Sequence, residues 1–224
     1  MMETNDVSRY LDLMVTVGCD LSKLQALVEK EDVNDNKVNE KIFAICSKEF
    51  TPRVWCQLED VTKHHIRSAF LDSRTAVISK GSFTSPIQSI TEAFESELKY
   101  KIFEDFNNEI SKYKENYKVS FDQNYIKQFE NEDGYFPSTM LLGKLKHVGS
   151  FNRQGTIAHD LAEYLRIGWD LYALSSNTGI ETAYSLLKIR NKYSHPKVEK
   201  DIEVYKKAHQ LTIETLKWFI SALK

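Results

Sequence analysis

Turn-forming residues are scarce in this chain of 224 residues, which contains only 8 glycines and 4 prolines. An all-β sandwich or barrel needs many tight turns, so the scarcity disfavours those folds and favours long helices. Long apolar runs are also missing, and no stretch of about 18 apolar residues predicts a membrane-spanning helix. The N-terminus, Met1–Asp6, is polar and carries acids where a signal peptide carries positive charge, so we expect a cytoplasmic protein without membrane contact.

Cysteine and net charge are low as well. The three cysteines, Cys19, Cys46 and Cys56, have no metal-binding spacing. We expect them to be small buried side chains of a reducing compartment, and we expect neither a metal site nor a cofactor. The formal net charge is −2, whereas a protein that coats nucleic acid without regard to sequence would be far more basic. A small local cluster could still hold one phosphate.

The residues that are present predict a globular protein built from helices. Hydrophobic residues make up 42% of the chain and charged residues 28%, which is typical of a folded domain. Thr51-Pro52 combines an N-cap with a first-turn proline, so we expect one helix from there toward Ile78. Ser85-Pro86 predicts the next helix start, and apolar residues at helical spacing continue that helix to Tyr117.

Further helices are expected after this long one, and the first fifty residues form a distinct part. Thr178 and Glu181 match a capping box that would open the penultimate helix. The remaining expected helical ranges are 141–148, 157–172, 178–190 and 200–224. Short helical patterns around a charged break at Asp32–Asn39 predict an N-terminal helical extension over residues 1–50. Residues 51–224 then form the main all-α domain.

The most informative segment is Arg190-Asn191-Lys192-Tyr193-Ser194-His195-Pro196. Arginine is a permanent cation that grips phosphate in a two-pronged geometry, and histidine exchanges protons near neutral pH. Together with an amide, these groups supply what metal-free RNA cleavage needs. On a straight helix the Cβ atoms of Arg190 and His195 would point about 140° apart. Pro196 opposes the helical conformation at His195, so His195 can turn back toward the arginine or toward a partner chain.

Arg-Asn-x-x-x-His at the end of a helix, followed by one final helix, resembles the motif of HEPN domains. Two other segments support the resemblance. Residues 90–103 resemble the long second core helix of some prokaryotic members, and residues 140–145 resemble the short leucine-glycine element that precedes the motif helix. The similarity covers roughly residues 50 to 224 and does not extend to the first fifty residues.

The resemblance implies a helical bundle that forms a homodimer, in which two motifs share one cleft. Many members are metal-independent ribonucleases of toxin, antiviral or RNA-processing systems, and a further possibility for this chain is a toxin kept silent by a partner protein encoded nearby. Carried onto this chain, His195 would act as general base or acid, Arg190 would stabilise the phosphorane, and Asn191 would position one of them. The products would be a 2′,3′-cyclic phosphate and a 5′-hydroxyl.

The surroundings of the motif add one hint and one departure. Lys188, Lys192 and Lys197, with Lys144 and Lys146 (five lysines in all), would form a basic rim that contacts RNA. Some toxin relatives carry a tyrosine, modified by a partner enzyme, where this chain has Lys197. Control by that route is therefore not supported.

Plainer interpretations remain open for each of these residues. Arg190 could satisfy a helix C-terminus and His195 could pack beside Pro196, which would make the protein a non-catalytic helical module that binds a protein or a nucleotide. The sequence places His65 at the edge of the core and His64 on the surface. The acids at positions 92, 95 and 97 could hold a general base, but the helical pattern predicts that they form a solvated face.

Overall fold

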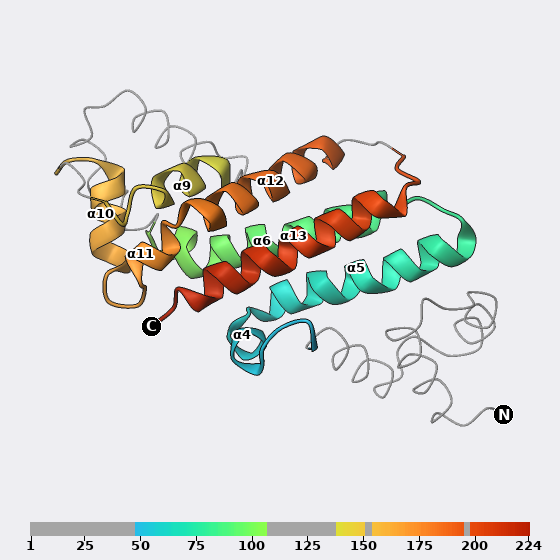
Figure 1. Ribbon diagram of the computed structural model, residues 1–224, viewed down its shortest axis with the longest axis horizontal. Coiled ribbons are helices and arrows are strands. Elements are labelled where there is room, and N and C mark those ends of the chain that lie inside the picture. Colours follow the sequence, from blue (N-terminus) through green and yellow to red (C-terminus); the bar gives the residue numbers. More distant parts are fainter. Residues whose placement is uncertain (1–47, 107–137, 151–153, 195–197) are drawn as a thin grey trace.

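The computed structural model describes residues 48–106, 138–150, 154–194 and 198–224, and four long helices dominate them. They are α5 (Asp60–Ser79), α6 (Thr84–Leu98), α12 (Asn177–Tyr193) and α13 (Ile202–Ser221). The helix α6 packs against each of the other three (Figure 1). This central position explains why both its apolar and its polar residues are buried.

Four short helices complete the described part of the chain. They are α4 (Pro52–Gln57), α9 (Ser138–Leu145), α10 (Ile157–Leu165) and α11 (Leu171–Leu174). The helix α9 packs against α12 and α10, whereas α4 and α11 contact α13 (Figure 1). The described ranges contain no strand, only an isolated bridge between Trp169 and Leu223, so the all-α prediction is confirmed. None of the described helices is long and apolar enough to cross a membrane.

The hydrophobic core follows the predicted apolar stripe of α6. Ile87, Ile90, Phe94 and Leu98 are all completely buried. Phe94 meets Phe219 of α13 edge to face, with ring centroids 5.8 Å apart. Aromatic pairs prefer this geometry, which adds to the gain from burial. The stripe therefore forms the contact between α6 and the last helix.

The single helix predicted from Thr51 toward Ile78 is wrong, because the chain breaks between α4 and α5. Thr51 caps α4 as expected, but Leu58 and Glu59 are extended. Leu58 is only 3% exposed, so the break carries an apolar side chain into the core. The backbone N–H of Glu59 donates to Glu97 Oε2 at 3.1 Å. A carboxylate of α6 thus takes the place of a local cap for α5.

The central helix differs from prediction at both ends. It begins at Thr84 rather than Ser85, because Ser82 Oγ accepts a hydrogen bond from the Thr84 N–H at 3.1 Å. After Leu98 the chain widens into a π-helical turn, Lys99–Phe103, which the periodicity did not predict. The predicted continuation to Tyr117 lies outside the described residues beyond position 106.

Two further helix boundaries were predicted wrongly. The range 157–172 is not one helix, since α10 ends at Leu165 and Asp170 opens α11 by accepting from the N–H groups of Tyr172 and Ala173. The Thr178 and Glu181 capping box is not the start of α12 either. Ser176 is the N-cap, and its hydroxyl accepts from the Gly179 N–H at 3.3 Å.

Gly179 of α12 lies directly against the indole of Trp218 in α13. A Cβ atom added there would lie 2.2 Å from Trp218 Nε1, far inside van der Waals contact. The indole cannot move without cost, because Nε1 donates to the carbonyl of Ala173 at 2.8 Å. Only glycine fits this crossing.

Replacing Gly179 with alanine should therefore destabilise the protein by about 1–3 kcal/mol, since the indole must shift in a packed interface. Urea unfolding followed by circular dichroism measures the change. Gly168→Ala is the matched control, because a Cβ there meets nothing within 4 Å. Equal stability of Gly179→Ala and Gly168→Ala would contradict the tight crossing.

Several predictions lie outside the described residues. These are the helices and charged break of residues 1–47, the apolar pattern of 107–137, Cys19 and Cys46. The remaining cysteine, Cys56, is exposed and free, so the prediction that it is buried is wrong. Its position on the outer side of the short α4 explains the difference, because Val54 and Trp55 turn inward instead.

Candidate functional site

Arg190 lies in the last turn of α12 and pairs with a carboxylate of the central helix. Its Nε is 2.8 Å from Oε2 of Glu95. The arginine side chain is 35% exposed and that of Glu95 only 10% exposed, so the pair reaches from the core to the surface. A partly buried ion pair of this kind is screened less by solvent and salt than an exposed one.

A third helix contributes to the same cluster. Ser138, the first residue of α9, donates its hydroxyl to Glu95 Oε1 at 2.6 Å. Both oxygens of Glu95 therefore have partners, one from α12 and one from α9. On the outer side, Arg190 Nη1 donates to Asn191 Oδ1 at 3.2 Å. The second terminal nitrogen, Nη2, has no hydrogen-bond partner among the described residues.

The acids of α6 do not form the solvated face that the helical pattern predicted. Glu95 is 8% exposed and Glu97 completely buried, and only Glu92 is exposed. Glu92 lies 3.6 Å from His65, which is half-buried while His64 is exposed, as predicted. Burial lowers the pKa of His65, and the nearby Glu92 carboxylate opposes that shift. Neither histidine contacts the Arg190 cluster.

Tyr193 is completely buried within the motif and ties the end of α12 to the residues before α13. Its hydroxyl donates to Glu199 Oε2 at 2.5 Å, and its carbonyl accepts from Gln88 Nε2 of α6 at 2.5 Å. Burial is the main cause of its raised pKa, and the hydrogen bond to Glu199 adds to it. The same hydrogen bond lowers the pKa of Glu199.

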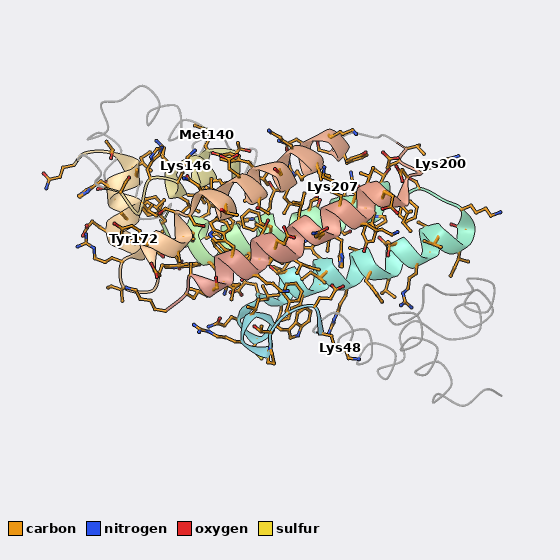
Figure 2. All side chains as sticks on the ribbon, in the orientation of Figure 1. Lys48, Met140, Lys146, Tyr172, Lys200 and Lys207 are labelled. Atoms are coloured by element: carbon orange, nitrogen blue, oxygen red, sulfur yellow. The ribbon has the colours of Figure 1, made fainter. Side chains whose placement is uncertain are left out.

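Glu199 also fixes this part of the chain to the start of α6. Its backbone N–H donates to Thr84 Oγ1 at 3.1 Å, and its carbonyl accepts from the Phe83 N–H at 2.7 Å. Lys200 follows directly and lies at the same end of the bundle as the turn between α5 and α6, whereas Tyr172 lies at the opposite end (Figure 2). Tyr193 and Glu199 are thus both anchored to α6.

His195 and Lys197, two of the predicted site residues, lie outside the described residues. Of the others, Arg190 and Asn191 are adjacent and in contact, and Lys188 and Lys192 are exposed on α12. The Nζ of Lys192 lies 5.1 Å from the centre of the Tyr193 ring. These two lysines remain available to a ligand that approaches α12 from solvent.

The wider basic rim predicted around the motif is wrong at Lys144. This side chain is only 6% exposed, because α9 turns it inward. Lys146 lies 3.8 Å from Glu181, which offsets its charge. The basic surface near Arg190 therefore depends on α12 itself and not on α9.

The cluster could bind one phosphate but offers no metal ligand set. A guanidinium with one terminal nitrogen unpartnered can donate to a phosphate oxygen. Within the described ranges, no three His, Cys, Asp or Glu side chains lie close enough to hold a metal ion. The pairing of Glu95 with Arg190 could not be predicted, since no local pattern links a mid-helix glutamate to an arginine 95 positions later.

Comparison with known proteins identifies no relative: no protein-family model, curated protein or solved structure matches this chain.

Proposed function

We propose that this protein is a metal-independent RNA endonuclease of the HEPN type that acts as a homodimer with a composite site. The observation that carries the proposal is the partly exposed Arg190 side chain, held by Glu95 in the last turn of α12 and next to Asn191. The motif continues to His195 and precedes the final helix, in the order that the HEPN resemblance requires. The proposal extends, through that resemblance, to a role in toxin or phage defence with an inhibitory partner protein.

The proposed reaction is an internal transfer within RNA. The 2′-oxygen attacks the adjacent phosphorus, the bond from phosphorus to the 5′-oxygen breaks, and a 2′,3′-cyclic phosphate and a 5′-hydroxyl result. His195 takes the 2′-hydroxyl proton or gives one to the leaving oxygen. Arg190 donates hydrogen bonds to the oxygens on which charge builds, and Asn191 positions one of the two. Lys188, Lys192 and Lys197 attract the neighbouring phosphates.

A second candidate function has its own support. Because Arg190 Nε is bound to Glu95, the arginine already serves to join α12 to α6. That contact favours a non-catalytic helical module that binds a protein partner or a nucleotide. The acidic balance of the chain, with a net charge of −2, agrees with this alternative.

One experiment separates the two functions. Purified wild-type protein and Arg190→Ala are incubated with total RNA in EDTA, and the fragment ends are analysed. We expect wild type to leave cyclic phosphate ends. We expect Arg190→Ala to cleave RNA at least about 100-fold more slowly, as when one charge-stabilising donor is removed.

Arg166→Ala is the matched control, since Arg166 is also a surface arginine in an ion pair, with Glu163. It should cleave like wild type. If folded wild-type protein leaves total RNA intact, the endonuclease proposal is wrong and the binding module becomes the better account.

A further inference from the structure

We propose that Glu95 is a positioning residue for Arg190, and that Ser138 in turn fixes Glu95. This inference rests on the proposed endonuclease function and names a residue that the motif does not contain. Glu95 belongs to α6, Ser138 to α9 and Arg190 to α12, so the cluster joins three helices from distant parts of the sequence.

The contacts and the burial of Glu95 favour an indirect role. Oε1 accepts from Ser138 and Oε2 pairs with Arg190, so both oxygens are already engaged within the protein. The residue is 8% exposed, whereas the Arg190 side chain is 35% exposed, so a ligand from solvent has far more access to the arginine. We therefore infer that Glu95 acts on the reaction through Arg190.

The pairing occupies one nitrogen of the guanidinium and leaves a terminal nitrogen for a ligand. Glu95 contacts Nε, the nitrogen nearest the aliphatic part of the side chain. Of the two terminal nitrogens, Nη1 donates to Asn191, and Nη2 has no partner among the described residues. The N–H groups of Nη2 can therefore donate to a phosphate oxygen.

Because Glu95 holds Arg190 in place before RNA binds, we expect it to affect the rate of the chemical step more than the affinity for RNA. A long side chain that is ordered in advance loses less entropy when it meets the transition state. The negative charge of Glu95 also offsets part of the arginine charge, which weakens attraction to ground-state RNA. Removing that charge should lower kcat without raising the KM for RNA.

The test compares wild type, Glu95→Gln and Glu92→Gln in cleavage of a fluorescent RNA in EDTA. Glutamine keeps the size of Glu95 and one acceptor for Arg190 but loses the charge. We expect kcat of Glu95→Gln to fall by about 10- to 100-fold, the range expected when a reacting group is slightly misplaced. Its Kd for an uncleavable 2′-O-methyl RNA should be equal to or lower than that of wild type. Glu92→Gln, on the exposed side of the same helix, should match wild type in both.

A double-mutant cycle with Ser138→Ala tests whether Ser138 acts on kcat through Glu95. If Ser138 acts through Glu95, Ser138→Ala lowers kcat on its own, and adding it to Glu95→Gln lowers kcat no further. Thermal melting of each variant checks that a change in kcat does not reflect unfolding.

The outcomes distinguish this inference from the proposed function. Wild-type cleavage together with an unchanged kcat for Glu95→Gln would overturn the positioning role alone. Weaker binding of the uncleavable RNA by folded Glu95→Gln, with kcat unchanged, would overturn it too. Intact RNA after incubation with folded wild type would overturn the endonuclease and, with it, the role of Glu95.

Discussion

Replacing His195 with alanine should abolish RNA cleavage, with a loss of about 100- to 10,000-fold. Alanine can neither take the proton from the 2′-hydroxyl nor give one to the leaving oxygen. The loss should appear in kcat, because an imidazole that works on the proton contributes little to holding the phosphates. Cleavage of a fluorescent RNA under single-turnover conditions in EDTA measures it directly.

His64→Ala is the matched control, since His64 is an exposed histidine of α5 whose only described hydrogen bond is a 3.4 Å contact with Ser68. It should retain wild-type activity. Wild-type rates for His195→Ala would remove the histidine from the mechanism and contradict the endonuclease proposal. Toxicity on expression provides a second test, because only a chain with His195 should slow growth of the host.

The all-α fold could be predicted from the sequence because its signal is local. Apolar residues recur every three or four positions along α6 and α13, and few glycines or prolines interrupt them. The break at Leu58 could not be predicted, because the group that caps α5 is Glu97, in another helix. The break before Asp170 could not be predicted because the apolar spacing continues across it, although the helix does not.

The candidate site was predictable only in part. Arg190 and Asn191 stand out because their side-chain chemistry and spacing form a motif within one segment. Glu95 does not, because its role depends on where α6 passes beneath α12. Its helix has neighbours on several sides, so the rule that charged residues of a helix face water fails there. Lys144 was misplaced by the same rule.

Replacing Lys101 with methionine should destabilise the protein by about 3–5 kcal/mol at neutral pH, the cost of leaving a buried charge without its partner. Lys101 Nζ lies 2.8 Å from Glu59 Oε1 and 3.3 Å from Glu97 Oε1. Glu97 is completely buried, and its other oxygen accepts the N–H that begins α5. Methionine keeps most of the aliphatic bulk, so the change isolates the charge. Urea unfolding measures the loss.

The loss should depend on pH in a defined direction. Burial raises the pKa of Glu97, although the neighbouring Lys101 opposes that shift. A carboxyl group whose pKa is raised on folding contributes most to stability when protonated, and this contribution disappears as the pH rises through the folded pKa. Without Lys101 the folded pKa rises further, so the deficit of Lys101→Met relative to wild type should grow with rising pH and shrink on acidification.

A second substitution separates this charge effect from simple packing. Adding Glu97→Gln to Lys101→Met removes the unpaired charge and should restore most of the lost stability at neutral pH, because no buried ion then remains. If the loss is instead the same at acidic and neutral pH, and the double variant recovers nothing, Lys101 acts through its aliphatic stem. The cap on α5 would then depend on Glu97 alone, and the break between α4 and α5 would not need the lysine.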